Sequence, residues 1–578
     1  MSNDEKNSND ALSIRVILQN GEIKFYPKGT ILKNIAKENS SLCAHEIVGA
    51  IVNNNLKELF KPLEKNCSIV FFDISSIYGN HFYTRSLAFL FIIAAEELFP
   101  NARVTIEHSV NKGYYCEIIN GSGTENGNGS ENGSGSENKF SEEDSNIIKA
   151  KMKELVERDI PFEKNEMLTP DAIALFQGLG KKDKISLMKH RTKPEVNVYR
   201  CNGYYDYFYG FMVPSTGYLK VFDLVYYSPG FILRFPERVD PKVVPQWIEQ
   251  KKLFKIFREA DAWGKILEME NIGHLNDAID QGRTIELINI AEGLHEKKYA
   301  AIADIIASKR DDIRLVLIAG PSSSGKTSSA HRLSTQLRIN GLKPIPISLD
   351  DFFLNREDTP TTPDGEYDFE TVHALDIKTF NEVMTSLISG KETEMPSFNF
   401  HTGSREWQGK KLQVNDEHIL VVEGIHGLNE LLTSSIPKEQ KFKIYVSALT
   451  HLGIDDHNRI PTSDLRLIRR ITRDFQFRSA SALKTIRMWE SVRRGEDIWI
   501  YPYQEEADVM MNSSLVYELS VLKKIAMPQL ALISEDVPEY IEAKRLIKFL
   551  EYFSDIDMAN VPLNSILREF IGGSCFFK

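Results

Sequence analysis

Hydrophobic and polar residues alternate differently along the chain, and each change of pattern predicts a change of structure. Near the start, the alternating segments IRVILQ and EIKFYP flank Asn20-Gly21, which predicts a β-hairpin. The following residues predict a helix over 30–39 and then short strands that end at FFDIS. The longest apolar run, over 87–95, is too short to cross a bilayer and predicts a buried helix. A small β-rich unit therefore opens the chain.

Beyond this unit, low-complexity residues interrupt the pattern. Residues 121–138, GSGTENGNGSENGSGSEN, are too polar to bury a core and predict a flexible insertion. Residues 141–157 predict a helix, 196–235 predict aromatic-rich strands, and 241–310 predict mainly helices. From 313 onward, apolar strands alternate with helices, so we expect a parallel sheet covered by helices. The fold class predicted for the whole chain is multidomain α/β.

The composition of the chain constrains its domain number and its cellular compartment but says little about the reaction. A chain of 578 residues is long enough for several domains. A net charge of −11 gives no overall signal for binding nucleic acid or an anionic membrane. The five cysteines show no CxxC spacing, which favours free thiols in a reducing compartment. The polar start MSNDEKNSND does not resemble a secretory signal, so we expect a cytoplasmic protein that does not enter membranes.

The most informative segment is IRLVLIAGPSSSGKT, residues 313–327. An apolar strand enters a Gly-x-x-x-x-Gly-Lys-Thr motif, and helical spacing follows until Asn340-Gly341. Glycines allow the backbone to wrap a polyphosphate, and the helix start presents free N–H groups to its charge. We expect Lys326 to reach the β- and γ-phosphates and the Thr327 hydroxyl to bind Mg²⁺. The residues expected to contact ATP are Gly320, Pro321, Ser322, Ser323, Ser324, Gly325, Lys326, Thr327 and Ser328.

Three later segments supply candidate catalytic groups. The strand PIPIS leads into Asp350 and Asp351, and the strand HILVVEG ends near Glu423. Carboxylates at strand ends beside a phosphate loop suit proton transfer from an acceptor hydroxyl or Mg²⁺ binding. The helical segment over 465–479 carries arginines that would neutralise a transferring phosphoryl group, or else form a solvated basic face. These arginines are Arg470, Arg473 and Arg478.

Together these segments resemble the uridine kinase and phosphoribulokinase family over about 313–530. The markers are the phosphate loop, SLDDFF, YDFETVHALD, PSFNFHTGSR, VVEG, RRITRD and ADVMMN, in the family's order. The resemblance implies that Asp350 is the catalytic base and also supports Mg²⁺ with Glu423. It implies a lid that carries the three arginines. It places the acceptor against Phe369, Glu370, Phe398, Phe400 and Arg405.

The sequence departs from this family on the acceptor side. Glu370 stands where the family has a ribose-binding aspartate, and Phe398 and Gly403 replace a tyrosine and a histidine that contact the base. A late lid arginine is Ala480 here. Because hydrogen bonds to a substrate discriminate strongly, their loss relaxes or redirects the choice of acceptor. We therefore expect a kinase whose acceptor is uridine, cytidine or a similar nucleoside, with another small hydroxyl compound as the alternative.

The amino-terminal half resembles part of the threonyl-tRNA synthetases. Residues 12–75 resemble the TGS domain, a β-grasp module, and 80–236 resemble the second additional domain, an α+β module that edits mischarged tRNA. The family's editing HxxxH pair, cysteine and histidine fall on residues that cannot bind a metal or transfer a proton. These are Arg85, Phe89, Phe208 and Met212. Isolated histidines such as His108, His190 and His274 lack ligand spacing and are interpreted as structural.

These observations predict a β-grasp domain at 12–75, an editing-like domain at 80–236, a helical connector at 241–310 and a kinase domain at 313–555. The predicted function is ATP- and Mg²⁺-dependent phosphoryl transfer to a small-molecule alcohol. A nucleotide-dependent RNA- or ribosome-binding regulator stays open as an alternative, which the acidic charge disfavours. Assembly into a homo-oligomer also stays open.

Overall fold

The computed structural model describes residues 13–100, 102–119, 140–362, 365–450 and 452–577. The predicted insertion at 121–138 lies outside these residues. No helix in the described ranges is both long and apolar enough to cross a membrane. The fold class predicted from sequence, multidomain α/β, is confirmed.

The first unit is a five-stranded sheet that packs on one short helix. The predicted hairpin at Asn20-Gly21 is present, because β1 and β2 pair antiparallel and β1 also pairs parallel with β5. The strand order is β2-β1-β5-β3-β4. Alternating burial along β1 directs Val16 into a core with Leu32 and Ile35. The elements are β1 (Ser13–Leu18), β2 (Ile23–Pro27), α2 (Leu32–Glu38), β3 (Gly49–Val52), β4 (Asn55–Lys57) and β5 (Cys67–Phe72).

The second unit combines two antiparallel sheets with four helices. The predicted buried helix is α3, whose residues 87–95 are all buried. One sheet has the order β11-β12-β7-β6 and the other β10-β9-β8. The elements are α3 (Ile77–Leu98), β6 (Arg103–Val110), β7 (Gly113–Ile119), α4 (Glu142–Glu157), β8 (Glu163–Leu168), α5 (Thr169–Gly178), α6 (Lys182–Lys189), β9 (Glu195–Cys201), β10 (Tyr204–Tyr207), β11 (Asp223–Tyr227) and β12 (Gly230–Arg234).

Three helices then lead to a parallel sheet. They are α7 (Lys251–Leu267), α8 (Ile272–Asp280) and α9 (Thr284–Ala307). The sheet has the order β14-β17-β13-β18-β21, and every neighbouring pair is parallel. The inner strands β13 and β18 are fully buried, as expected where helices cover both faces, whereas the edge strand β14 is only partly buried. The strands are β13 (Leu315–Ala319), β14 (Lys343–Ser348), β17 (His418–Glu423), β18 (Lys441–Ser447) and β21 (Val509–Asn512).

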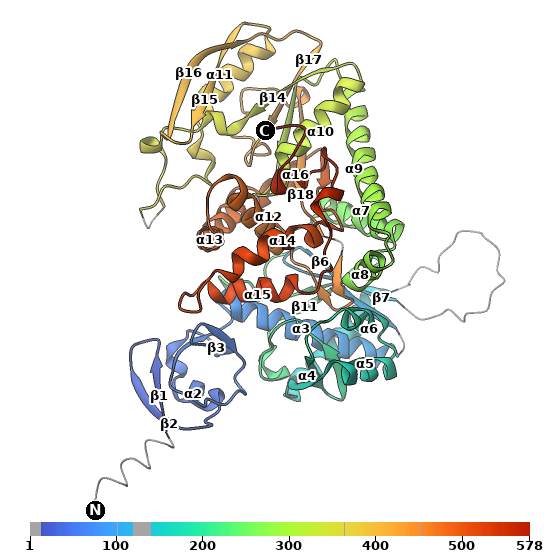
Figure 1. The fold of residues 1–578 in the computed structure, drawn as a ribbon, viewed down its shortest axis with the longest axis vertical. Coiled ribbons are helices and arrows are strands. Elements are labelled where there is room, and N and C mark those ends of the chain that lie inside the picture. Colours follow the sequence, from blue (N-terminus) through green and yellow to red (C-terminus); the bar gives the residue numbers. More distant parts are fainter. Residues whose placement is uncertain (1–12, 101, 120–139, 363–364, 451, 578) are drawn as a thin grey trace, which may run out of the picture.

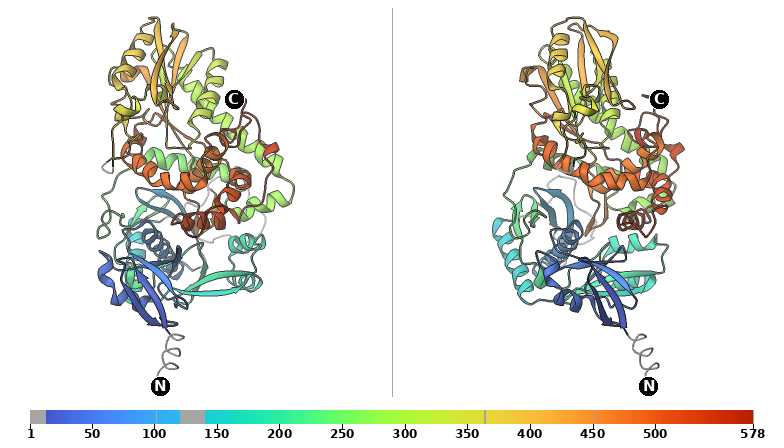
Figure 2. Two further views of the ribbon diagram at one scale, coloured as in Figure 1. Left: turned by 60° about the vertical axis from the view of Figure 1, so that its left-hand side comes forward. Right: turned by 90° about the vertical axis from the view of Figure 1, so that its left-hand side faces the viewer.

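Helices and two hairpins complete this part. The hairpins are β15 (Thr393–Asn399) with β16 (Ser404–Leu412), and β19 (Gly453–Asp455) with β20 (Asn458–Arg459). The helices are α10 (Lys326–Ile339), α11 (Ile377–Ile388), α12 (Thr462–Phe477), α13 (Ala482–Trp499), α14 (Glu518–Ala531), α15 (Tyr540–Leu550) and α16 (Arg568–Ile571). Figures 1 and 2 place the β15–β16 hairpin at one end of the molecule and the β1–β5 unit at the other, with α14 and α15 between them.

A buried charge network joins the second unit to the parallel-sheet part. Lys184 of α6 is fully buried and lies 2.7 Å from Asp455 of β19 and 3.1 Å from Asp206 of β10. His457 contacts the same Asp206 carboxylate at 2.6 Å. Because a buried charge is costly unless it is paired, these contacts specify how the two parts dock.

Candidate active site

The phosphate loop has backbone geometry that requires its glycines. β13 ends at Ala319, the loop covers 320–325, and α10 begins at Lys326. A Cβ added at Gly320 would lie 1.9 Å from the Val446 carbonyl oxygen, so only glycine fits there. Gly325 has φ +84° and supplies the left-handed residue that starts the helix. The strand, loop and helix therefore form the phosphate cradle that the motif predicts.

Lys326 is partly buried within this cradle. Its Nζ donates a 3.1 Å hydrogen bond to the Pro321 carbonyl oxygen. Burial lowers the pKa of Lys326, while the carboxylates of Glu423 and Asp350 act in the opposite direction. The Lys326 ammonium group therefore lies near Glu423 and Asp350, the two carboxylates that sequence analysis assigned to the same site.

Those two carboxylates follow neighbouring strands. Asp350 comes directly after β14 and Glu423 ends β17, where Ser348 and Glu423 are paired across the strands. Burial raises the pKa of Asp350, and burial together with the Asp350 charge raises the pKa of Glu423 to about 7. Neighbouring carboxylates with raised pKa values are typical of proton-transfer or cation-binding sites.

The arginines approach the loop from α12 and its end. Arg470 Nη1 donates a 2.8 Å hydrogen bond to Ser322 Oγ of the phosphate loop. Burial lowers the pKa of Arg473 to about 10, and this side chain lies 3.8 Å from both Asp474 and Glu569. Arg478 is the C-cap residue of α12, which ends at Phe477, and its backbone nitrogen donates to the Asp474 carbonyl oxygen. At this less restrained position Arg478 remains half exposed and pairs with Asp474 at 3.4 Å.

The acceptor segments form an aromatic cluster beside the carboxylates. The Phe353 ring contacts those of Phe369 and Phe398, with centroid distances of 6.2 and 5.7 Å. Burial raises the pKa of nearby Glu370 to about 7. Gly495 of α13 lies so close that an added Cβ would be 2.3 Å from the Glu370 Cβ. The cluster therefore combines flat apolar rings with one partly buried carboxyl group.

Two predicted acceptor residues lie at the margin of this cluster. Phe400 is 63% exposed and touches only the Phe398 ring among the aromatic groups described. Arg405 is held by an ion pair of 2.8 Å to Asp376, the cap of α11. Phe400 therefore joins the aromatic cluster through Phe398, and Arg405 is engaged by Asp376.

Two functional candidates escaped sequence analysis because they are distant in the chain. Glu569 of α16 accepts hydrogen bonds from the Ser328 backbone nitrogen at 3.2 Å and from its hydroxyl at 2.9 Å. Glu496 of α13 accepts a 3.0 Å bond from the Ser322 backbone nitrogen and is itself held by Arg466 at 2.5 Å. Their separations of 241 and 174 residues leave no local pattern to detect.

The residues present fit a nucleotide phosphate and a divalent cation. The Ser323 and Ser324 hydroxyls of the loop are buried and have no hydrogen-bond partner among the described residues. Thr327, Asp350 and Glu423 offer the oxygen donors that Mg²⁺ prefers. The phosphate cradle thus has hydroxyl groups available to bind a phosphate, and oxygen atoms available to bind Mg²⁺.

The four editing-like positions also come together, in the second unit. The Phe89 and Phe208 rings lie 5.0 Å apart, and Met212 belongs to the same hydrophobic cluster. Arg85 Nη1 donates a 2.8 Å hydrogen bond to the Phe211 carbonyl oxygen. Apolar packing and one structural arginine occupy these positions.

Comparison with known proteins matches the two halves separately. Residues 315–519 match the Phosphoribulokinase / Uridine kinase family. The threonine–tRNA ligase of Syntrophotalea carbinolica is 29% identical over 212 residues, which cover 36% of this chain and 31% of the ligase. That of Thermotoga neapolitana is 27% identical over 222 residues, covering 38% and 32%. This chain spans about a third of the length of these curated relatives.

Solved structures similar to this chain include two described as kinases. A putative fructose transport system kinase from Silicibacter has 14% identity and a TM-score of 0.26, and covers 37% of this chain and 98% of its own. A possible uridine kinase from Bacillus stearothermophilus has 16% identity and a TM-score of 0.25, covering 36% and 97%. The family match, together with the phosphate loop and parallel sheet, identifies residues 315–519 as a phosphoribulokinase/uridine kinase family domain that follows a threonine–tRNA ligase-like amino-terminal part.

Proposed function

We propose that the protein is an ATP-dependent kinase that transfers the γ-phosphoryl group to a hydroxyl of a small molecule, with a nucleoside 5′-hydroxyl as the leading acceptor. The observation that carries this proposal is the meeting of Lys326, Asp350 and Glu423 at the ends of neighbouring strands. A phosphate cradle beside two carboxylates suits phosphoryl transfer to a hydroxyl.

The chain's own groups account for each part of the transfer. Lys326 and the loop amides bind the phosphates of ATP, and Arg470 and Arg473 offset charge on the transferring group. The Asp350 carboxylate accepts the proton of the acceptor hydroxyl as its oxygen bonds to the γ-phosphorus and ADP leaves. Its raised pKa makes Asp350 a better proton acceptor than an ordinary aspartate.

Thr327, Asp350 and Glu423 are the residues that would hold Mg²⁺. A bound Mg²⁺ supplies positive charge that neutralises the β- and γ-phosphate oxygens. The Glu423 carboxyl group, with a pKa of about 7, must lose its proton before it binds a cation.

The aromatic cluster supports a ring-bearing acceptor such as a nucleoside. Phe353, Phe369 and Phe398 offer flat apolar faces, and Glu370 offers a carboxyl group for a sugar hydroxyl. The absence of the family's tyrosine and histidine at Phe398 and Gly403 argues against strict discrimination between bases.

The decisive experiment is acceptor-dependent ADP release. Purified full-length protein is incubated with ATP and Mg²⁺ against a panel of nucleosides, sugars and other small alcohols. We expect one class, nucleosides first, to stimulate ADP release and to yield a phosphorylated product, and Asp350→Asn to abolish both. Stimulation by a sugar instead of a nucleoside would support the proposed kinase activity but contradict a nucleoside as the acceptor.

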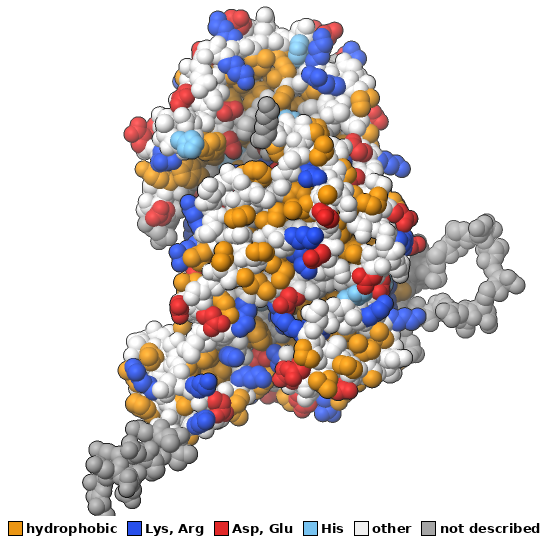
Figure 3. Space-filling view, viewed as in Figure 1, with side chains coloured by type: hydrophobic (Ala, Val, Ile, Leu, Met, Phe, Trp, Pro, Cys, Tyr) orange, Lys and Arg blue, Asp and Glu red, His pale blue; other side chains and the backbone are white. Residues whose placement is uncertain are grey.

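A nucleotide-dependent RNA-binding regulator is the alternative favoured by the threonine–tRNA ligase-like amino-terminal part. On the face shown in Figure 3, however, lysine and arginine side chains are interspersed with acidic ones. Extended nucleic-acid sites are instead usually basic. ATP hydrolysis that ignores every acceptor, combined with saturable tRNA binding, would favour the regulator over the kinase.

A further inference from the structure

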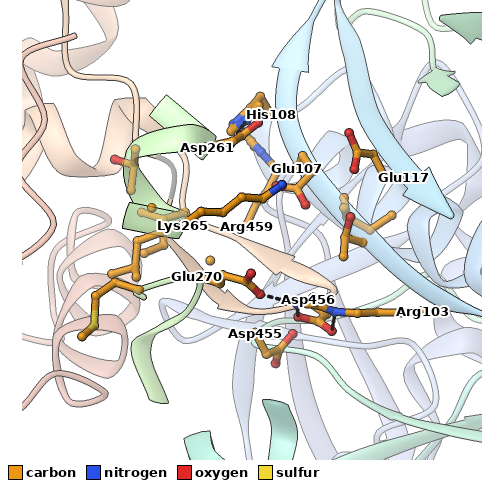
Figure 4. Close-up of a pocket in the computed structure, with 18 of the residues that line it drawn as sticks. Arg103, Glu107, His108, Glu117, Asp261, Lys265, Glu270, Asp455, Asp456 and Arg459 are labelled. Atoms are coloured by element: carbon orange, nitrogen blue, oxygen red, sulfur yellow. Dashed lines mark hydrogen bonds and ion pairs between the residues drawn. The ribbon is translucent and has the colours of Figure 1, made fainter. Parts of the chain in front are cut away.

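A cavity of about 270 Å³ lies where three parts of the chain meet. Its walls come from strands β6 and β7, helix α7 and the β19–β20 hairpin (Figure 4). None of the residues placed in the candidate active site lines it. The cavity is therefore a separate feature of the junction between the amino-terminal part and the kinase-family domain.

A histidine and two carboxylates face one point of this cavity. The ligand-type atoms of Glu107, His108 and Asp261 all lie within 4.8 Å of one another. His108 Nε2 and Asp261 Oδ1 are 2.8 Å apart. In Figure 4 His108 and Asp261 lie side by side and Glu107 extends into the same space. Imidazole nitrogen and carboxylate oxygen are common ligands of divalent metals.

Local structure explains how two successive residues reach one cavity. Successive side chains of a regular strand point to opposite faces, but the pairing of β6 with β7 shifts between Ile106 and Ser109. Glu107 and His108 occupy this irregularity, and both line the cavity. The His108 ring then stacks on Phe257 of α7, with a centroid distance of 4.0 Å and an interplanar angle of 12°. Its imidazole is therefore fixed in orientation.

Two neighbouring guanidinium groups are engaged by other carboxylates, whereas Arg459 lies over the Tyr114 ring and Lys265 also lines the cavity. Arg103 pairs with Asp456 at 2.7 Å and with Glu270 at 2.8 Å, and Arg258 pairs with Glu117 at 2.5 Å. The Glu107 carboxylate makes no ion pair with any residue that the structure describes. Two carboxylates thus lie close together while Arg103 and Arg258 form ion pairs with other acidic groups. A bound divalent ion would share their negative charge with the Lys265 ammonium, which extends beside Glu107 in Figure 4.

A buried hydroxyl beside the Glu107 carboxylate gives a second indication of a ligand. Thr105 precedes Glu107 by two residues on β6, is 5% exposed and lines the same cavity. Its Oγ1 has no hydrogen-bond partner within bonding distance among the described residues. Buried polar groups are normally satisfied, so this hydroxyl suits a water molecule or ion in the cavity.

We propose that Glu107, His108 and Asp261 bind one divalent transition-metal ion. Binding replaces the hydrogen bond between His108 Nε2 and Asp261 Oδ1. The metal takes the lone pair of Nε2 while the ring proton is carried on Nδ1, so that His108 binds as a neutral imidazole. The two carboxylates balance the +2 charge, and water completes the coordination. A mixed nitrogen and oxygen set without thiolate suits Zn²⁺, Co²⁺ or Mn²⁺ better than soft Cu⁺.

Such an ion would tie the two halves together. Glu107 and His108 belong to β6 of the second unit, whereas Asp261 belongs to α7. Helix α7 packs against the kinase-family sheet through a cluster that includes Phe257 and Met510. The site therefore bridges a strand of the amino-terminal part and a helix that rests on the sheet of the phosphoryl-transfer site.

The test is Co²⁺ binding to the full-length chain, prepared with chelator and then dialysed free of it. An Asp350→Asn, Glu423→Gln background removes the carboxylates of the proposed Mg²⁺ site. We expect one equivalent of Co²⁺ by equilibrium dialysis, visible ligand-field absorption, and displacement by Zn²⁺. Glu107→Gln and His108→Gln should each weaken binding by at least about tenfold. Glu117→Gln is the matched control, because this carboxylate lines the same cavity but pairs with Arg258.

Thermal unfolding separates loss of a ligand from loss of the fold. We expect Co²⁺ to raise the melting temperature of the parent and of Glu117→Gln, but not that of Glu107→Gln. Because Glu107 makes no ion pair among the described residues, its replacement should fold even if His108→Gln does not. Less than about one tenth of an equivalent bound, or binding that survives Glu107→Gln and Asp261→Asn, would overturn the proposal.

Discussion

The Glu569 carboxylate accepts hydrogen bonds from both the backbone nitrogen and the hydroxyl of Ser328, in the first turn of α10. The same segment places Ile566 so that a Cβ on Gly325 would be 2.7 Å from its Cγ2. A carboxylate therefore stands at the positive end of the phosphate-loop helix, where an anion is favoured. The end of the chain and a bound polyphosphate would compete for this position.

We predict that Glu569→Gln strengthens ATP binding by about three- to tenfold, because one negative charge near the phosphates is removed while an oxygen acceptor is kept. Isothermal titration calorimetry measures the dissociation constant. Glu551→Gln, at a partly exposed carboxylate that pairs with Lys193, serves as control and should leave ATP binding unchanged. Weaker binding in Glu569→Gln would mean that the carboxylate supports the loop and does not compete with the nucleotide.

Replacing Asp350 tests the proposed base. Asp350→Asn should lower kcat by at least about a hundredfold in an ADP-release assay, since an amide cannot accept the acceptor's proton. The matched variant is Asp351→Asn, whose carboxylate accepts a 3.2 Å hydrogen bond from the Phe398 backbone nitrogen. We expect Asp351→Asn to keep kcat within about threefold. Equal losses in both variants would contradict a distinct role for Asp350.

The raised pKa of Glu423, about 7, gives a pH dependence with a defined sign. The folded chain retains a proton that the unfolded chain releases at lower pH. In the metal-free protein, the free energy of unfolding should therefore fall as pH rises from about 4.5 through about 7. Apparent Mg²⁺ affinity should rise over the same upper range, because protons compete with the cation.

Chemical denaturation and Mg²⁺ titration across this pH range measure the two effects. Glu423→Gln should remove the contribution of the Glu423 carboxyl group to the pH dependence of stability and of Mg²⁺ affinity. If the variant retained both slopes in full, another group would have to account for them; Glu370, whose pKa is also about 7, would be the next to replace.

The close contact at Gly320 predicts a severe defect from a single methyl group. Gly320→Ala would place Cβ 1.9 Å from the Val446 carbonyl oxygen, which must move or displace the loop. We expect ATP binding to fall by at least about tenfold. Gly293→Ala on α9 is the matched control, because nothing lies within 4 Å of its added Cβ. This control should be neutral or stabilising by about 0.5–1 kcal/mol in thermal unfolding.

Replacing the buried Lys184 tests how much the charge network between the two halves contributes to stability. Lys184→Met removes the cation between Asp206 and Asp455 and leaves two buried carboxylates, at a cost of about 3–5 kcal/mol in the free energy of unfolding. Lys189→Met is the control, because Lys189 is largely exposed where it pairs with Asp277. Urea denaturation compares the two; similar small losses would show that the network contributes little to docking.

The sequence by itself determined those features whose physics is local. Apolar β-branched runs, the Asn20-Gly21 turn and the Gly320–Thr327 motif predict strands, a hairpin and a phosphate loop, because each depends on neighbouring residues. Acidic residues at the ends of β14 and β17 were also predictable, since parallel strands bring their carboxyl ends to one edge.

Only the tertiary structure decided which distant groups meet. Glu569 reaches Ser328 across 241 residues, and Asp261 reaches His108 across 153, through packing that no local pattern encodes. His108 was interpreted as structural from its isolation in sequence, and only the irregular pairing of β6 with β7 places it beside two carboxylates. Long-range contacts depend on how whole elements dock, which is why the parts of the chain were predictable and the environments of these side chains were not.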